Sequence, residues 1–333
     1  MTPVAGHPLV SIVIPAHNAS ATIGECIEAC LAQSYPHIEV IVVDDGSTDD
    51  TPRIVQSRSV RFIRQGQQGP AAARNRGARE ANGEIIAFTD SDCVPAEDWI
   101  ERLVAGFDGD IVAVGGTYGI ANEESLFARM VHEEIQCRHA TFEEFVDFLG
   151  SFNVAVLKRA FDEAGGFDEH FRAASGEDND LSYRLLDAGG KLRFARDAVV
   201  CHYHPTRFGR YMRTQMRHGF WRMKLYAKHP QRMRGDRYAG ITDLIAPMLM
   251  LILGLLSFLV LLGPPTPFYI GLSLGVIVVL LAARLPVPWG MYARTKDRRM
   301  LGFVGIMLIR DLARALGMAQ GIWTFRIRRK TTA

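Results

Sequence analysis

The chain has 333 residues, of which 48% are hydrophobic and 22% are charged. This composition supplies a sizeable apolar core and excludes a wholly disordered chain. The formal net charge is only +2, but the charges are divided unevenly, because residues 1–200 carry 17 basic and 32 acidic side chains and residues 201–333 carry 21 basic and 4 acidic ones. The division indicates two regions with different roles, and the basic region needs an anionic partner.

The chain contains five cysteines, namely Cys26, Cys30, Cys93, Cys137 and Cys201. Cys26 and Cys30 would share one face of a helix, but no histidine or second pair completes a zinc site. The odd number and the lack of a CxxC pair predict buried thiols in a reducing compartment. Residues 1–8 lack the basic and long apolar segments of a signal peptide, so none is expected.

Strand-like and helix-like segments alternate through the first 90 residues. The strand-like runs are Val10–Ile14, Ile38–Val43, Val60–Ile63 and Glu84–Thr89, and helical spacing occurs at Ala19–Gln33 and Ala71–Ala81. Such alternation predicts an α/β fold with a parallel sheet. No GxGxxG motif follows the first strand, which disfavours a dinucleotide cofactor.

Polar residues follow three of these strands, at His17–Asn18, Asp44–Asp45 and Asp90–Asp92. The carboxyl ends of parallel strands line the ligand crevice of such sheets. Asp44–Asp45 can accept N–H groups of a base or ribose, or belong to a helix cap. The two carboxylates of Asp90 and Asp92 suit Mg²⁺ or Mn²⁺, although a single DxD is also common in solvated loops.

A third acidic group precedes an amphipathic segment. Glu177, Asp178 and Asp180 come directly before Leu181–Leu186. One of these acids can act as a general base if it reaches an acceptor hydroxyl. The alternative is that they complement the dipole at a helix N-terminus.

Residues 206–240 are predicted to form a basic interfacial arm. Its basic side chains alternate with apolar ones at three- and four-residue spacing, and they are Arg207, Arg210, Arg213, Arg217, Arg222, Lys224 and Lys228. This spacing predicts an amphipathic helix on a membrane surface. Nucleic-acid binding uses a similar composition, but the adjoining apolar segments argue against nucleic acid as a partner.

Two uncharged runs follow, at Leu244–Leu262 and Phe268–Ala283, with Gly263–Pro267 between them. Their lengths predict a hairpin of two transmembrane helices over residues 241–285. The alternative, two buried helices of a soluble domain, is disfavoured because both runs are apolar all round. The connecting loop lacks Lys and Arg and basic residues follow the second run, so both ends should face the cytoplasm.

Residues 286–333 are predicted to form a cytoplasmic basic loop, an amphipathic helix and a basic tail. The segment Leu301–Phe325 is apolar, but charged residues interrupt it between positions 310 and 314. This pattern is more typical of an interfacial or partly inserted helix than of a third span. The tail Arg326–Lys330 is expected at the anionic cytoplasmic leaflet.

Four motifs occur in order over about residues 8–225. They are SIVIPAHNASATIGECIEACLAQSYPHIEVIVVDDGSTDDT, GPAAARNRGAREANGEIIAFTDSDCVP, Phe161–Asp168 and Gly176–Leu181. This succession resembles the family 2 glycosyltransferases of the GT-A fold, including their membrane-anchored bacterial members. The resemblance implies a Rossmann-like, mixed but mainly parallel sheet flanked by helices over residues 1–205, followed by the C-terminal transmembrane hairpin.

The resemblance also implies roles for individual residues toward a nucleotide-sugar donor. The donor-binding residues would be Pro15, Asn18, Asp44, Asp45, Arg74, Asp90, Arg213, Gln215 and Arg217. Asp90, Asp92 and His202 would hold Mg²⁺ or Mn²⁺ on the diphosphate. Asp178 would be the catalytic base, with Glu177 as the second candidate.

Three features of the sequence depart from this family pattern or leave a role open. His17 stands where relatives often carry an aromatic ring that stacks on the base. His202 is a metal ligand or, equally, a member of a solvated pair with His204. Polymer-making relatives carry QxxRW, whereas the segment Gln215–Trp221 does not fit that motif. The departure favours transfer of a single sugar.

One base without a positioned nucleophile predicts single displacement with inversion at the anomeric carbon. Asp178 would take the acceptor proton, while a metal and nearby arginines offset charge on the leaving diphosphate. The acceptor is expected to be lipid-linked or membrane-proximal, at the cytoplasmic (inner) membrane, with anionic lipid as a further partner. Two alternatives are a processive polysaccharide synthase and an inactive, membrane-bound scaffold that binds sugar nucleotides.

Overall fold

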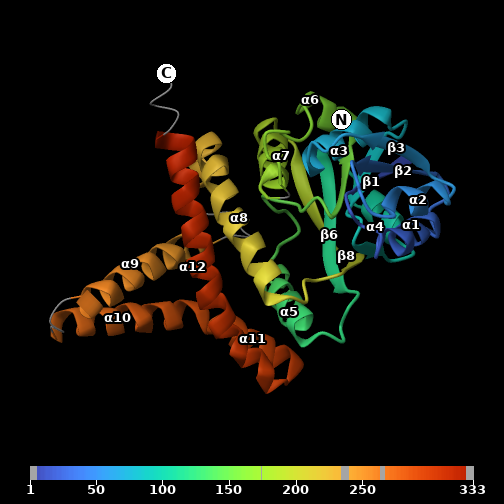
Figure 1. The fold of residues 1–333 in the computed structure, drawn as a ribbon. Coiled ribbons are helices and arrows are strands. Elements are labelled where there is room, and N and C mark those ends of the chain that lie inside the picture. Colours follow the sequence, from blue (N-terminus) through green and yellow to red (C-terminus); the bar gives the residue numbers. More distant parts are fainter. Residues whose placement is uncertain (1–5, 174, 234–239, 263–266, 328–333) are drawn as a thin grey trace. The chain divides into compact units, whose positions relative to one another are not determined.

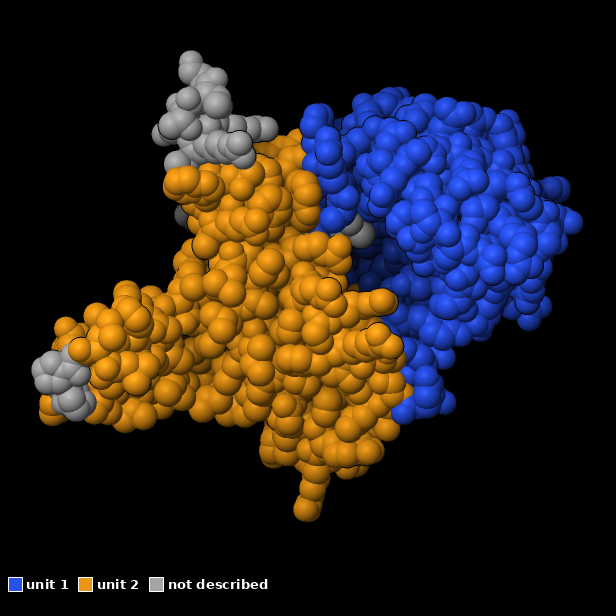
Figure 2. Space-filling view, in the orientation of Figure 1, with its two compact units in different colours: residues 1–124, 141–204 blue, residues 125–140, 205–333 orange. Residues whose placement is uncertain are grey.

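The computed structural model of the chain describes residues 6–173, 175–233, 240–262 and 267–327 (Figure 1). The chain folds into two compact units, which Figure 2 colours separately. Unit 1 consists of residues 1–124 and 141–204, and unit 2 consists of residues 125–140 and 205–333. Residues 125–140 lie within the predicted catalytic domain of residues 1–205, but they pack in unit 2.

Among the described residues, eight strands form one sheet in the order β3-β2-β1-β4-β7-β6-β8-β5. The strands are β1 (Val10–Ala16), β2 (Ile38–Asp45), β3 (Arg61–Gln65), β4 (Ile85–Thr89), β5 (Cys93–Pro95), β6 (Ile111–Ile120), β7 (Asn153–Leu157) and β8 (Lys191–His202). Strands β3, β2, β1 and β4 are parallel, as are β6 and β8, whereas β7 and β5 run antiparallel to their neighbours. The predicted mixed, mainly parallel α/β sheet is confirmed.

Helices flank this sheet. They are α1 (Ile23–Leu31), α2 (Thr51–Gln56), α3 (Pro70–Glu80), α4 (Trp99–Ala105), α6 (Lys158–Glu163) and α7 (Glu177–Asp187). Of these, α1, α3 and α7 lie at the segments for which the sequence predicts helical spacing. Every residue of β1 is buried, as expected for a strand covered on both faces. Helix α1 buries Ile23, Cys26, Ile27 and Cys30, which lie on one helical face.

The prediction of buried thiols is confirmed for three of the cysteines, whereas Cys137 and Cys201 are partly exposed. All five are free, and the structure describes every one of them. Cys26, Cys30 and Cys93 are fully buried in the core of unit 1. These three thiols therefore contribute to packing and not to a disulfide framework.

Close packing fixes helix α3 against the sheet. A Cβ atom on Gly77 would lie 2.3 Å from Val13 Cγ1, so the absence of a side chain lets α3 approach β1 closely. The buried side of the same helix carries Arg74, whose side chain is only 1% exposed. The sheet and α3 together therefore hold a buried guanidinium beneath the carboxyl ends of the strands.

Unit 2 is helical. Its elements are α5 (Leu126–His139), α8 (Phe208–Lys228), η1 (Pro230–Arg232), α9 (Thr242–Leu262), α10 (Pro267–Arg284), α11 (Pro286–Thr295), η2 (Arg298–Gly302), α12 (Phe303–Ile322) and η3 (Trp323–Ile327). The predicted basic helix corresponds to α8, and the predicted helix after the hairpin corresponds to α12. Two predictions fall on residues outside the described ones. They are the predictions for the outer loop, at 263–266, and for the basic tail, at 328–333.

The apolar segments Thr242–Leu262 and Pro267–Thr295 are long and apolar enough to cross a membrane, by length and composition. Only 17% of the most apolar stretch of each is buried within the protein. Large side chains such as Leu255, Phe258 and Val278 are more than half exposed. Extended apolar exposure of this kind marks an interaction surface and disfavours two buried helices of a soluble domain.

Helices α8 and α12 pack in parallel along their length (Figure 1). A Cβ atom on Gly317 would lie 1.9 Å from the Met216 carbonyl oxygen, and one on Gly219 would lie 2.1 Å from the Arg314 carbonyl oxygen. Backbone thus touches backbone at both glycines. Small residues at such a crossing are typical of helix pairs in membrane proteins.

Candidate active site

The loops after β1 and β2 meet at the carboxyl edge of the sheet. His17 Nδ1 lies 2.9 Å from the Asp45 carbonyl oxygen. The backbone N–H of Asn18 donates to Ser47 Oγ at 2.9 Å, and Asn18 adopts a positive φ of 50°. The two predicted polar clusters therefore form one hydrogen-bonded edge, directly after the buried Pro15 of β1.

Both aspartates at the end of β2 bind groups within the protein. The Asp45 carboxylate accepts the backbone N–H groups of Gln68 and Gly69, at 2.8 and 2.7 Å, and is only 4% exposed. Asp44 pairs with Arg64 Nε at 3.1 Å. The Asp45 carboxylate thus orders the loop that leads into α3, whereas Asp44 connects β2 to β3.

Exposed polar side chains stand beside these buried acids. Gln67 Nε2 lies 3.2 Å from His17 Nε2, and both side chains are exposed. Sequence reasoning singled out His17 as a departure but did not identify Gln67, because a lone glutamine in a loop carries no motif. The pair is available to a ligand at this edge.

Arg74 connects two of the predicted acidic motifs. Its Nη2 lies 2.6 Å from Asp90 Oδ1 and its Nη1 lies 3.0 Å from Glu177 Oε1. The guanidinium also lies over the Phe167 ring, 5.5 Å from its centroid. Burial alone would lower the pKa of Arg74, but the charges of Asp90 and Glu177 raise it above its usual value. Arg74 is therefore a fixed cation between the two motifs.

The acids at the start of α7 occupy different environments. Glu177 is 1% exposed, and burial together with the charge of Asp178 raises the pKa of Glu177 to about 7. Its second oxygen accepts the Ser175 backbone N–H at 2.7 Å. Asp178 is partly exposed, accepts the Asn179 backbone N–H at 2.9 Å and lines a small apolar cavity beside Phe167. Of the two predicted base candidates, Asp178 is thus the one that a ligand can reach.

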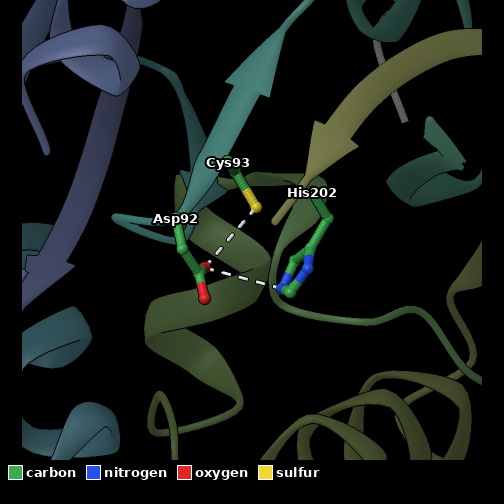
Figure 3. A group of neighbouring side chains, drawn as sticks. All are labelled: Asp92, Cys93 and His202. Carbon is green, nitrogen blue, oxygen red and sulfur yellow. Dashed lines mark hydrogen bonds and ion pairs between the residues drawn. The ribbon is translucent and has the colours of Figure 1, made fainter. Parts of the chain in front are cut away.

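Asp92, Cys93 and His202 converge at one edge of the sheet (Figure 3). Strand β5 pairs antiparallel with β8, and Cys93 lies directly opposite His202 in the register. Residues directly opposite each other share a face of the sheet. Asp92 Oδ1 lies 3.5 Å from His202 Nε2 and 4.0 Å from Cys93 Sγ. The possible ligand atoms of these three residues all lie within 4.8 Å of one another.

The chemistry of this group fits a hard divalent cation. Asp92 offers a carboxylate oxygen, the donor that Mg²⁺ and Mn²⁺ prefer, and His202 adds an imidazole nitrogen, a donor typical of transition-metal sites. Burial, followed by the charges of Asp92 and Asp90, raises the pKa of Cys93 well above its usual value, so the thiol stays protonated and is a poor ligand. Asp90 is not one of the three convergent residues, because its Oδ1 is bound by Arg74.

The remaining predicted donor residues, Arg213, Gln215 and Arg217, lie on α8 in unit 2. Gln215 is buried, and its Oε1 accepts a hydrogen bond from Arg314 Nε at 2.9 Å. Arg213 and Arg217 are exposed. Gln215 therefore has a defined role in the packing of α8 against α12.

Comparisons with known proteins identify relatives of this chain by sequence and by fold. A family model described as Glycosyl transferase family 2 matches residues 11–173. The glycosyltransferase AglE of Haloferax volcanii is 36% identical over 231 residues, which cover 64% of this chain and 72% of that protein. A pre-mycofactocin glycosyltransferase of Mycobacterium tuberculosis is 31% identical over 242 residues, which cover 68% of this chain and 49% of that protein.

Among solved structures, the fold is similar to that of the mannosyltransferase PcManGT from Pyrobaculum calidifontis, whose structure contains GDP-Man and Mn²⁺. The TM-score is 0.60 at 17% identity, and the match covers 98% of this chain and 90% of that one. This likeness supports the GT-A fold of the eight-stranded sheet. The chain, with its glycosyltransferase relatives, belongs to glycosyl transferase family 2 and is a glycosyl transfer enzyme.

Proposed function

We propose that the protein moves one sugar from a nucleotide-sugar donor to a hydroxyl acceptor, with inversion at the anomeric carbon. The observation that carries this proposal is the bridge from Asp90 through Arg74 to Glu177, with Asp178 next in sequence. The bridge joins a strand-end acid, where a diphosphate would be held, to the start of α7. Single displacement needs a general base and a site for the leaving diphosphate close together, and this cluster offers both.

Asp178 acts as the general base in this proposal. It is partly exposed, whereas Glu177 is buried against Arg74 and receives the Ser175 N–H. Asp178 takes the proton of the acceptor hydroxyl as that oxygen attacks the anomeric carbon, and the nucleoside diphosphate departs. Glu177 is a positioning residue that fixes the first turn of α7 through Arg74.

Asp92 and His202 would hold a divalent cation, Mg²⁺ or Mn²⁺. When bound, such an ion supplies positive charge to the leaving diphosphate. The Mn²⁺ and GDP-Man in the structure of PcManGT support this assignment. Asp90 stays a candidate through its second carboxylate oxygen, since Oδ1 is bound by Arg74.

The donor nucleobase is proposed to bind at the edge formed by the loops after β1 and β2. Asp45 shapes that edge through the loop that it orders, and Asp44 does so through its ion pair with Arg64. The exposed His17 and Gln67 lie at the same edge.

The acceptor is proposed to be lipid-linked or membrane-proximal, with the catalytic unit on the cytoplasmic side. The support is the pair of apolar helices α9 and α10, together with the basic residues that follow them. A membrane anchor raises the local concentration of acceptors held in the same bilayer.

A panel of nucleotide-sugars tests the proposal. The purified full chain should release nucleoside diphosphate from one or a few donors, only with Mn²⁺ or Mg²⁺ and only when membrane lipid extract is present. Loss of release in a chelator, with recovery on adding Mn²⁺, would support the metal assignment. Release of nucleoside diphosphate without the extract would contradict a lipid-linked acceptor. Products that contain many sugars would indicate a processive synthase.

A further inference from the structure

Helix α12 turns its charged side chains inward. Arg310 and Asp311 are 1% and 0% exposed, whereas Ile309 and Leu316 on the other side are 49% and 51% exposed. A surface helix of a water-soluble protein shows the opposite arrangement. The exposed stripe of α12 is therefore suited to an apolar surrounding.

The buried charges of α12 lie at the base of the apolar hairpin. Asp311 Oδ2 lies 2.7 Å from Nε of Arg284, the last residue of α10. Asp243, in the first turn of α9, pairs with Arg138 at 2.8 Å and with Arg284 at 3.1 Å. Both ends of the hairpin thus meet one ion network. If the hairpin spans the bilayer, this network lies at the depth of lipid phosphates.

Within the described ranges of the chain, the cations of this network outnumber the acids. The arginines are Arg138, Arg284, Arg310 and Arg314, and the carboxylates are Glu134, Asp243 and Asp311. Arg310 Nη1 bonds Glu134 at 2.5 Å and Tyr211 at 3.2 Å, but the buried Nε and Nη2 of Arg310 find no hydrogen-bond acceptor among the residues that the structure describes. Buried guanidinium donors without acceptors are costly unless an anion binds nearby.

The positive charge extends along the α8 side of the seam. His218 on α8 is partly buried, and burial together with the charges of Arg314, Arg222, Arg217 and Arg310 lowers the pKa of His218 to about 3. In the described part of the chain, Arg314 pairs with Asp243, whose Oδ1 lies 3.6 Å from Arg314 Nη1. Arg310 and Arg314 lie one turn apart on α12 and both contact α8, through Tyr211 and Gln215, so their guanidinium groups together attract a multiply charged anion.

We propose that the seam between α8 and α12, at Arg310 and Arg314, binds the phosphate group of a membrane lipid. Arginine forks match phosphate oxygens in geometry and charge. The exposed apolar stripe of α12 lies on the same helix and provides a surface for acyl chains. This inference rests on the membrane placement of the hairpin given under Proposed function, and it does not depend on the transferase assignment.

Native mass spectrometry of the full chain in a neutral detergent tests the site without any donor. The probes are phosphatidic acid, diacylglycerol with the same acyl chains, and inorganic phosphate. Phosphatidic acid should bind at least tenfold more tightly than either of the other probes. Arg314→Gln should weaken phosphatidic acid binding by about tenfold or more, because the fork and its charge are both lost.

Arg299→Gln is the matched control, since Arg299 is an exposed arginine of the same unit that pairs with Asp297. It should leave phosphatidic acid binding within twofold of the unaltered chain. Arg314→Lys keeps the charge without the fork and should bind at an intermediate level, which guards against misfolding of the Gln variant. Equal binding of diacylglycerol, or unchanged binding by Arg314→Gln, overturns the proposal. If inorganic phosphate binds as tightly as phosphatidic acid, the proposal of a lipid ligand is wrong and the site binds a soluble anion.

Discussion

At the scale of single residues, the site separates two neighbouring acids by their surroundings. Glu177 is buried against Arg74, whereas Asp178 is partly exposed beside a cavity. The same backbone turn thus supplies one acid that fixes the helix and one that a substrate can reach. The difference in burial leads to an expectation about catalysis for Asp178 and one about stability for Glu177.

Asp178→Asn should lower kcat by about 10²- to 10⁴-fold, the usual contribution of a general base. Donor affinity should stay within a few fold, because the amide keeps the size of the side chain. Steady-state kinetics with a competent donor and acceptor, together with donor binding by calorimetry, measure both quantities. Asp187→Asn, at the exposed C-terminal end of the same helix, is the control. A variant at 178 with full activity would refute the base assignment.

Glu177 should make stability depend on pH. Its pKa is raised from 4.5 to about 7 in the folded chain, so the folded state holds a proton that the unfolded state releases. The stability contribution of Glu177 is therefore fully present below about pH 4.5 and declines as pH rises to about 7, by roughly 3 kcal/mol in all.

Denaturant unfolding across this pH range, compared with Glu177→Gln, measures that contribution. The Gln variant cannot release a proton, so its stability should decline less steeply between pH 4.5 and 7. Identical slopes in the two proteins would show that Glu177 titrates normally in the folded chain.

At the scale of elements, the packing of α8 against α12 depends on the missing side chain of Gly317. Gly317→Leu should separate the helices, because even a Cβ atom there would lie 1.9 Å from the Met216 carbonyl oxygen. We expect a loss of at least about 3 kcal/mol and a lower melting temperature in detergent. Gly305→Leu on the same helix is the control, since a Cβ there meets nothing within 4 Å. Equal melting temperatures would contradict the close crossing.

Sequence patterns predict the strands and the acids at their ends, because parallel strands present their carboxyl ends at one edge. They do not predict the bond between Arg74 and Glu177, since these residues lie 103 positions apart and share no motif. The pairing of Cys93 with His202 likewise depends on the antiparallel register of β5 and β8. Long-range contacts of this kind follow from the topology of the whole sheet.

The predicted helices of unit 2 are present, but the orientation of α12 does not follow from periodicity. Spacing identifies two faces of a helix, and charged faces normally meet water. In this chain the partners of Arg310 and Asp311 are Glu134 on α5 and Arg284 on α10. The local sequence of α12 does not contain those partners, so it cannot show which face is buried.

At the scale of the whole molecule, helix α5 belongs to unit 2, although in sequence it lies between strands β6 and β7 of unit 1. Glu134 on this helix pairs with Arg310 and Arg138. Burial alone would raise the pKa of Glu134, but the charges of Arg310 and Arg138 lower it to about 2. The stability that Glu134 contributes is therefore present above pH 4.5 and is lost as pH falls toward 2.

Glu134→Gln should destabilise unit 2 by about 3 to 5 kcal/mol, because the buried Arg310 loses its acid and Arg138 keeps only its pair with Asp243. Chemical denaturation of the full chain in detergent measures the effect. Glu133→Gln removes the neighbouring acid, whose pair with Arg294 is 3.4 Å long and partly exposed, and it should cost about 1 kcal/mol or less. Similar losses in the two variants would contradict the role of the buried network.

The place of α5 in the chain also limits how the enzyme can be divided for study. A fragment that ends at residue 204 keeps α5 but loses its packing partners, which include Tyr211, Met291 and Phe303. Met130 and Val131 would then meet water, and Glu134 would lack Arg310. Such a fragment should aggregate on expression even with an intact sheet. Replacing residues 125–140 with a short polar linker is the change that we expect to yield a soluble, monodisperse catalytic fragment.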